Sequence, residues 1–251
     1  MTELCDPTII VTCGHEGSSA FTQILHELGV FLGKPSNLAS NSRKQYFEYT
    51  PFQELNREML GAKAYPYDHF ELEDRFKQIL TYFLDKDFHD TARKAIIHSM
   101  LNDGLKHGMQ WALKDPRTCI TFPVWLKIFP DAKFIFLDRS QQDTLIGWNT
   151  KGDDGYFPTK KHWYSNFAMV KDETKKIVIH YDELSYEFEK TVKFLCSWFN
   201  VKKPIPLIMK ELSKLWVPKY NGVIGKPTEK PDRFKIGNIA FNEDRDAFPK
   251  P

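Results

Sequence analysis

Residues 8–21 constrain the fold of this chain more than any other part of the sequence. A β-branched run at 8–12 leads into a small-residue loop, and the loop opens a helix whose apolar residues recur at helical spacing. In such a strand–loop–helix, unpaired backbone N–H groups and the positive end of the helix dipole converge on one point. Ser18 and Ser19 add hydroxyl donors. The stretch predicts a phosphate or sulfate site, and an ordinary strand-to-helix turn with a serine N-cap is the alternative.

The loop lacks the lysine of a nucleoside-triphosphate loop. The pattern G-x-x-x-x-G-K-[ST] places a lysine directly after its last glycine, where it reaches the outer phosphates. Here Gly17 is followed by Ser18, and the sequence shows no obvious carboxylate for magnesium. Both observations argue against an ATP-dependent phosphotransferase, which stays open as an alternative.

The composition is typical of a globular protein with one domain. The chain has 251 residues, of which 41% are hydrophobic and 27% are charged. Its net charge of +2 gives no reason to expect nucleic acid as a partner. No apolar run approaches the roughly 20 residues of a membrane span, and the polar, acidic N-terminus does not resemble a secretory signal. We therefore expect one domain over residues 1–251, located in the cytoplasm.

The spacing of cysteine and histidine predicts no metal site. The four cysteines are scattered, without a C-x-x-C pair or a disulfide framework, and the eight histidines include no H-E-x-x-H arrangement. Dispersed cysteines favour reduced thiols, which fits the cytoplasm. We expect no metal cofactor.

Strand-like and helical patterns alternate along the chain. Short apolar runs predict strands at 8–12, 133–137 and 177–181, and periodic apolar residues predict helices at 72–84, 92–113 and 184–199. This alternation predicts an α/β fold, a three-layer sandwich with a central, mainly parallel sheet. Ligands of such sheets bind beyond the carboxyl ends of the strands. The loop 13–20 and the segment after Leu137 are therefore expected to face one pocket.

Three further segments carry expectations. The glycine-rich stretch 147–157 predicts a flexible loop that could act as a lid. Residues 205–251, rich in Pro, Gly and Lys, are expected to form a C-terminal extension that wraps the body or is partly mobile. Lys160-Lys161-His162 is a local basic patch that could meet an acidic acceptor, with a solvated loop as the preferred interpretation.

Several short motifs then follow in order. Tyr46-Phe47-Glu48 comes first, K-D-P-R follows at 114–117, and F-P-D-A-K-F-I-F-L-D-R follows at 129–139. I-H-Y-D-E-L at 179–184 comes last. Together with the Gly/Ser loop, this order resembles the sulfotransferase family, especially its bacterial and phage-like branch, over about residues 8–200.

The resemblance implies a P-loop-like fold and chemistry with 3′-phosphoadenylyl sulfate. In that family the sulfuryl group passes in line to a hydroxyl or amine, adenosine 3′,5′-bisphosphate is left, and no metal is required. Such a transfer is expected to have a loose transition state whose charge is neutralised by positioned donors.

The resemblance also implies roles for the donor-binding residues. The phosphosulfate would lie on the loop residues His15, Glu16, Gly17, Ser18, Ser19 and Ala20. Arg139 matches the arginine that holds the 3′-phosphate, for which a surface ion pair with a nearby aspartate is the alternative. Gly147 stands where the family has a serine that touches the same phosphate.

Three residues are catalytic candidates. Lys114 matches the lysine of K-D-P-R and would neutralise charge on the transferred group. Glu48 is the candidate general base, with a solvated glutamate as the alternative. His15 competes for that role, because imidazole titrates near neutrality, although within the loop it is better placed to donate to an oxyanion.

Two departures from the family pattern weaken the prediction. Glu16 would repel a bound phosphosulfate unless it points away or pairs with a cation, and Gly147 lacks the serine hydroxyl, for which Ser140 or Thr144 could substitute. A non-catalytic relative that only binds a nucleotide or a partner is therefore a further alternative. For an active enzyme, aromatic residues at 46–70 and 156–164 suit a small-molecule, saccharide or lipid-like acceptor, but core packing accounts for them equally well.

Overall fold

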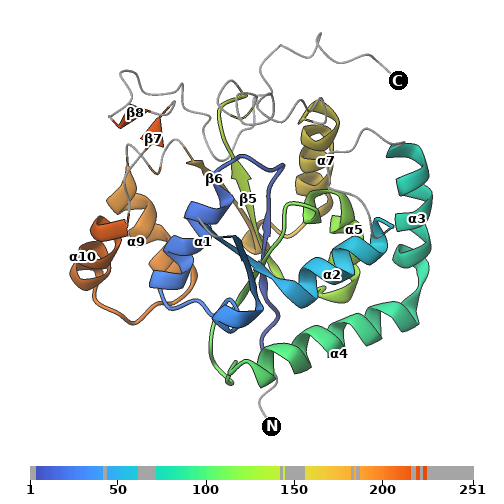
Figure 1. Ribbon diagram of the computed structural model, residues 1–251, viewed down its shortest axis with the longest axis horizontal. Helices are drawn as coiled ribbons and strands as arrows, with labels where there is room; N and C mark the ends of the chain where they lie inside the picture. The colour runs from blue at the N-terminus through green and yellow to red at the C-terminus, as the bar shows by residue number, and fades with distance from the viewer. Residues whose placement is uncertain are drawn as a thin grey trace.

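The computed structural model describes residues 4–41, 44–61, 72–141, 144, 156–181, 184, 187–215, 219–220 and 223–224. At its centre lies a four-stranded sheet in the order β4-β1-β5-β6. The strands are β1 (Thr8–Val11), β4 (Ala112–Lys114), β5 (Lys133–Asp138) and β6 (Lys176–His180), and neighbouring strands pair in parallel. All carboxyl ends therefore meet at one edge of the sheet (Figure 1).

Helices cover both faces of this sheet (Figure 1). On one side lie α1 (Ser18–Glu27), α9 (Phe188–Trp198) and α10 (Ile205–Leu215), and on the other lie α3 (Leu72–Leu84), α4 (Lys86–Asn102), α5 (Thr118–Ile128) and α7 (Tyr156–Met169). The expected three-layer α/β fold with a mainly parallel sheet is confirmed.

The remaining elements lie outside the central sheet. After α1 come a 3₁₀ turn η1 (Pro35–Asn37), the antiparallel hairpin of β2 (Leu38–Asn41) and β3 (Lys44–Tyr49), and α2 (Thr50–Met59). A second 3₁₀ turn, η2 (Glu173–Lys175), precedes β6, and β7 (Lys219–Tyr220) pairs with β8 (Val223–Ile224).

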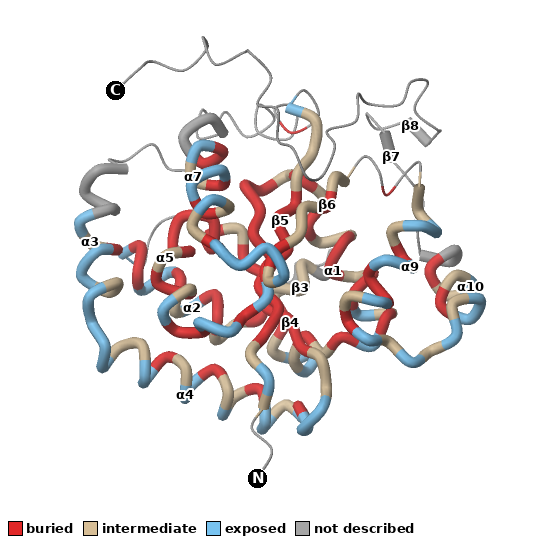
Figure 2. Tube along the Cα trace, turned by 180° about the vertical axis from the view of Figure 1, so that it is seen from behind, coloured by how far each residue is buried: buried red, intermediate tan, exposed pale blue. Residues whose placement is uncertain are grey.

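The core is built around the two central strands. Every residue of β1 is buried, as are four consecutive residues of β5 (Figure 2). The rings of Phe122, Trp163 and Phe167 contact Phe136 with centroid distances of 5.7, 5.4 and 5.2 Å. Such continuous burial explains the alternation-free apolar runs in the sequence. It also fixes the strand ends at which the loops begin.

Helix α5 is buried along most of its length and contains a proline. Pro123 has no N–H, so it cannot donate to the carbonyl of Cys119 one turn earlier. The side chain of Asn166 in α7 donates to that carbonyl instead, at 2.6 Å. The exchange satisfies a buried acceptor and ties α5 to α7.

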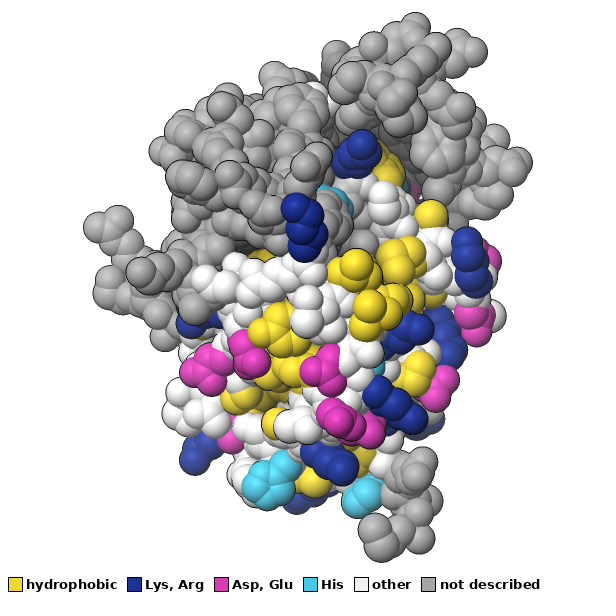
Figure 3. All heavy atoms as spheres, turned by 90° about the vertical axis from the view of Figure 1, so that its right-hand side faces the viewer, with side chains coloured by type: hydrophobic (Ala, Val, Ile, Leu, Met, Phe, Trp, Pro, Cys, Tyr) yellow, Lys and Arg dark blue, Asp and Glu magenta, His cyan; other side chains and the backbone are white. Residues whose placement is uncertain are grey.

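The outer face of the α3–α4 side carries charges of both signs among exposed hydrophobic side chains (Figure 3). Leu80 and Leu84 of α3 are among the exposed hydrophobic residues of the described chain. Scattered apolar residues of this kind are normal on protein surfaces.

The predicted helix at 92–113 is wrong in its second half. Helix α4 ends at Asn102, Gly104 and Gly108 follow with φ angles of 110° and 83°, and Ala112–Lys114 forms strand β4. The apolar residues at 112 and 113 belong to the sheet, where they pair with β1. The apolar residues beyond Asn102 continue the helical spacing only by chance, and their packing in the sheet determines the conformation that they adopt.

Two sequence expectations fall largely or wholly on undescribed residues. Within the expected extension 205–251, α10 places Ile208 and Leu212 in the core, while most of the chain beyond it lies outside the described residues. Residues 147–155 also lie outside the described residues, and with them the expected lid and Gly147.

Candidate functional site

The loop between β1 and α1 turns sharply at the carboxyl edge of the sheet. Gly14, His15 and Gly17 have positive φ angles of 85°, 55° and 77°. Gly17 is the N-cap of α1, and among the described residues no side chain caps this helix end. An uncapped first turn leaves backbone N–H groups available to a ligand or water. Ser18, Ser19 and Ala20 form that turn, as the sequence predicts.

Arg139 reaches this loop from the neighbouring strand. It follows β5 directly, and its Nη1 donates to the carbonyl oxygen of His15 at 3.2 Å. Its guanidinium lies 5.1 Å from the centre of the Tyr181 ring. That ring also covers Gly17, where an added Cβ would lie 2.1 Å from the Tyr181 Cε2 atom. Arg139, the loop and Tyr181 therefore form one cluster, which we call the donor cluster because the sequence predicts that the sulfuryl donor binds there.

Glu16 is buried and turned beneath the loop. Its carboxylate accepts hydrogen bonds from the Thr12 hydroxyl at 2.9 Å and the Cys13 N–H at 2.7 Å. It also forms an ion pair with Lys160 at 2.7 Å. Burial raises the pKa of Glu16, and the charge of Lys160 opposes that rise. The conditions under which Glu16 is compatible with a bound anion are both met: it points away and pairs with a cation.

The structure corrects the interpretation of Lys160. The preferred expectation, a solvated loop at 160–162, is wrong, because these residues lie within α7 and Lys160 is buried. The pairing with Glu16 supplies the physical reason: a buried carboxylate needs a buried cation.

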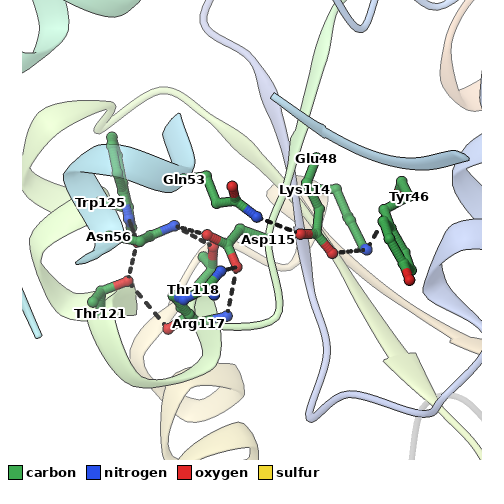
Figure 4. A network of polar contacts seen from close by, with 10 residues as sticks. All are labelled: Tyr46, Glu48, Gln53, Asn56, Lys114, Asp115, Arg117, Thr118, Thr121 and Trp125. Atoms are coloured by element: carbon green, nitrogen blue, oxygen red, sulfur yellow. Dashed lines mark hydrogen bonds and ion pairs between the residues drawn. The ribbon is translucent and has the colours of Figure 1, made fainter. Parts of the chain in front are cut away.

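Glu48 and Lys114 form a second cluster (Figure 4). Lys114 Nζ lies 2.7 Å from Glu48 Oε1 and donates to the carbonyl of Tyr46 at 3.3 Å. An irregular stretch of the β2–β3 hairpin brings Glu48 and the Tyr46 carbonyl to Lys114. The pairing of the two strands shifts register between Ala39 and Ser40, and Phe47 has a φ angle of 56°. Bulges of this type re-aim side chains at functional sites. The Lys114 side chain is only 2% exposed, so its charge is matched at close range.

The two clusters lie at the same edge of the sheet. Ile10 of β1 and Lys114 of β4 are register partners, so the loop begins just beyond the level of Lys114. Arg139 follows β5, on the other side of β1. Of the residues predicted for the site, the structure thus brings the loop, Arg139, Lys114 and Glu48 to one edge.

Comparison with known proteins identifies the fold. No protein-family model matches this sequence, and no curated protein matches it. The sulfotransferase domain from the curacin biosynthetic pathway is similar in structure, with a TM-score of 0.50 and 16% identity over 83% of this chain and 78% of its own. This chain has the sulfotransferase fold.

Two other solved structures are similar at lower scores. Sulfotransferase STF9 from Mycobacterium avium has a TM-score of 0.44 and 14% identity over 86% of this chain and 68% of its own. The sulfotransferase domain from the Synechococcus PCC 7002 olefin synthase has a TM-score of 0.43 and 14% identity over 81% and 76%.

Within this sulfotransferase fold, a buried polar network supports the second cluster (Figure 4). Asn56 of α2 donates to Asp115 at 3.0 Å and accepts hydrogen bonds from Thr121 at 2.5 Å and Trp125 at 2.7 Å. Burial raises the pKa of Asp115, and the Arg117 guanidinium, at 3.0 Å, opposes that rise. The network holds α2 and α5 against the residue that follows Lys114.

Sequence reasoning did not predict the roles that four residues have in this arrangement: Gln53, Asn56, Lys160 and Tyr181. Gln53 donates to Glu48 at 2.6 Å, and its spacing of three from Asn56 puts both on one face of α2. That spacing was a usable signal. Lys160 and Tyr181 lie in the basic patch and in the I-H-Y-D-E-L motif, but neither pattern indicates their partners, which lie far away in the sequence.

The described residues contain no group of three His, Cys, Asp or Glu side chains arranged to hold a metal ion. None of the described helices combines the length and apolar character needed to cross a membrane.

Ser140 and Thr144, the two residues that could substitute for the missing serine hydroxyl, contact each other. Thr144 is buried, and its hydroxyl donates to the carbonyl of Ser140 at 3.0 Å. Its hydroxyl is therefore used within the chain.

Proposed function

We propose that this protein is a sulfotransferase that uses 3′-phosphoadenylyl sulfate and transfers the sulfuryl group to a hydroxyl or amine. One observation carries the proposal. Arg139, which follows β5, contacts the loop that precedes helix α1, whose first turn no described side chain caps, with 3.2 Å between Nη1 and the His15 carbonyl oxygen. Two anion-binding groups thus converge at the carboxyl edge of a sulfotransferase fold.

The donor cluster suits the two phosphate-bearing ends of such a nucleotide. Backbone N–H groups of Gly17 to Ala20 and the hydroxyls of Ser18 and Ser19 would hold the 5′-phosphosulfate. The Arg139 guanidinium would hold the 3′-phosphate, because its planar fork matches phosphate oxygens. Glu16 does not oppose this binding, since its carboxylate is buried against Lys160.

The second cluster suits the transfer itself. When bound, the donor supplies a sulfuryl group attached to a good leaving group. Lys114 would neutralise charge that develops on the transferred group. Each Glu48 oxygen accepts one hydrogen bond, from Lys114 or Gln53, and keeps a lone pair for a proton of the acceptor hydroxyl. His15, which lies in the loop, would donate to an oxyanion.

The acceptor is proposed only as a class. A small molecule, a saccharide or a lipid-like compound with a free hydroxyl or amine fits the chemistry, and no nucleic acid is expected because the net charge is only +2.

Calorimetry with adenosine 3′,5′-bisphosphate tests the proposal, with ADP and ATP as comparisons and no metal added. We expect binding that depends on the 3′-phosphate. Arg139→Ala should weaken it by about 2–4 kcal/mol if a charged hydrogen bond to the phosphate is lost. Arg93→Ala is a matched control, because Arg93 pairs with Asp6 just before β1, at the opposite edge of the sheet.

Each alternative has its own outcome. A preference for ATP would favour a phosphotransferase, and a failure to bind any of the three nucleotides would favour a non-catalytic relative. Equal affinity of the Arg139→Ala variant and the unmodified protein would remove Arg139 from the site. Where binding is found, transfer from labelled donor to panels of hydroxyl and amine compounds identifies the acceptor class.

A further inference from the structure

An ion network that is buried at Lys160 and Glu16 and partly exposed at Asp138 and His180 lies beneath the donor cluster. Lys160 Nζ is 2.7 Å from Glu16 Oε1 and 2.6 Å from Asp138 Oδ1. The other oxygen of Asp138, Oδ2, lies 2.9 Å from Nδ1 of His180. The four residues come from the loop after β1, the last residue of β5, the last residue of β6, and α7.

Each carboxylate or imidazole in this network is next in sequence to a residue of the donor cluster. Glu16 lies between His15 and Gly17, and Asp138 precedes Arg139. In the same way His180 precedes Tyr181, the ring that contacts both the loop and the arginine. A displacement of any network member therefore moves a neighbour that lines the site.

Lys160 joins the separate parts of this network. Among the described residues, it is the one that pairs both with Glu16, in the loop after β1, and with Asp138, the last residue of β5. Its side chain is 7% exposed and the Glu16 side chain is fully buried, so water cannot solvate either charge if the pair is broken. The Lys160 ammonium also lies 4.5 Å from the centre of the Trp163 ring, which fixes it from the α7 side.

We propose that Lys160 is a positioning residue for the donor site: it fixes the loop that bears Gly17 relative to the strand end that bears Arg139. This inference rests on the proposed function, since it assigns Lys160 to the shape of the site that would bind the donor. Lys160 acts through Glu16 and Asp138.

Removing Lys160 alone would mix two effects. It would loosen the loop, and it would leave two carboxylates facing each other beneath an anion site. The double variant Glu16→Gln/Lys160→Met separates them, because one negative and one positive charge are lost together and the net charge stays the same. Any loss of anion affinity in this variant then reports position.

Lys176→Met is the matched control. Lys176 is also a buried lysine, and it donates to the carbonyls of Val170 and Phe167 at 2.8 and 3.2 Å. It begins β6, at the amino edge of the sheet and away from the donor cluster. A general loss of stability should appear in both variants, whereas a change of the donor site should appear only in the first.

Calorimetry with adenosine 3′,5′-bisphosphate and hydrogen exchange of the amides at 12–19 give the two readouts. We expect the double variant to bind at least tenfold more weakly and to exchange faster at 12–19. Lys160→Arg keeps the positive charge and the pairing with Glu16 and Asp138, so its affinity should stay within about threefold of that of the unmodified protein. Lys176→Met should change neither readout.

The outcomes separate the two proposals. If the unmodified protein fails to bind the nucleotide, the proposed function is wrong, and the proposed role in the donor site falls with it, even where the exchange data show that Lys160 orders the loop. If the unmodified protein binds and the folded double variant binds equally well, only the role of Lys160 is overturned. Equal losses in the double variant and in Lys176→Met would also overturn it. Should the double variant not fold, Glu16→Gln/Lys160→Gln replaces it with the same expectations.

Discussion

At the scale of single residues, Gly17 is constrained twice. Its φ angle of 77° disfavours any L side chain, and a Cβ there would lie 2.1 Å from Tyr181. We therefore expect Gly17→Ala to lower the free energy of unfolding by more than the 1–2 kcal/mol of a left-handed alanine. It should also weaken nucleotide binding, because Tyr181 must move away from Arg139. Urea unfolding and calorimetry measure the two effects.

Gly29→Ala is the control for that prediction. Gly29 has a φ angle of 86°, and nothing lies within 4 Å of an added Cβ. The backbone cost is therefore similar, while the steric clash is missing. If the two variants lose equal stability and nucleotide affinity is unchanged in both, the Tyr181 ring moves aside at no cost to stability or binding, and the prediction is wrong.

At the scale of elements, helix α2 holds the second cluster through two side chains. Asn56 is buried and serves Asp115, Thr121 and Trp125, so its removal leaves several buried polar groups without a partner. We expect Asn56→Ala to lower the free energy of unfolding by about 2–4 kcal/mol, because each unsatisfied group costs about 1–3 kcal/mol. Chemical denaturation measures this change.

Gln53→Ala provides the comparison on the same face of α2. It removes a single hydrogen bond, to Glu48, and should cost about 1 kcal/mol. If Asn56→Ala proves no more destabilising than Gln53→Ala, the buried network does not hold α2 against α5.

Local patterns allowed some elements to be predicted and concealed others. The strands β1, β5 and β6 and helix α3 lie where apolar spacing placed them, because buried strands and amphipathic helices leave a periodic signal. Strand β4 has only three residues, too few for any period. Helix α5 is buried almost all round and contains Pro123, so it lacks the amphipathic stripe by which helices are recognised.

The same contrast holds for the candidate site. The position of Arg139 could be predicted because it follows a recognisable strand in a family-like segment, and that of the loop because it joins a strand to a helix. The pairing of Glu16 with Lys160 spans 144 positions, and no local pattern encodes it. Only the tertiary structure explains how Glu16 is accommodated in a loop that is predicted to bind an anion.

At the scale of the whole molecule, buried carboxyl groups make stability depend on pH in opposite directions. Burial raises the pKa of Glu16 and of Asp115, despite nearby cations. Their folded forms therefore bind protons more tightly than the unfolded chain, so their contributions increase as the pH falls toward the ordinary carboxyl range. Asp138 differs: burial works to raise its pKa, but hydrogen bonds from His180 and Lys160 and their charges hold it at about 2.

Asp138 should therefore stabilise the fold above the unfolded pKa of 3.8 and lose that contribution as the pH falls through about 2. The shift corresponds to about 2 kcal/mol, since one pKa unit is about 1.4 kcal/mol. We expect the free energy of unfolding of the unmodified protein to fall by that much more than that of Asp138→Asn between about pH 4 and pH 2. Urea unfolding at a series of pH values measures both curves.

Asp131→Asn is the control for this pH dependence. Asp131 also has a lowered pKa, through its hydrogen bond and ion pair with Lys175, but it is exposed and its pair is screened by water. Asp131→Asn should therefore leave the fall in the free energy of unfolding between about pH 4 and pH 2 nearly unchanged. Parallel curves for the unmodified protein and Asp138→Asn would mean that Lys160 and His180 do not stabilise the Asp138 carboxylate. The network beneath the donor cluster would then lack the electrostatic coupling that ties β5 to β6 and α7.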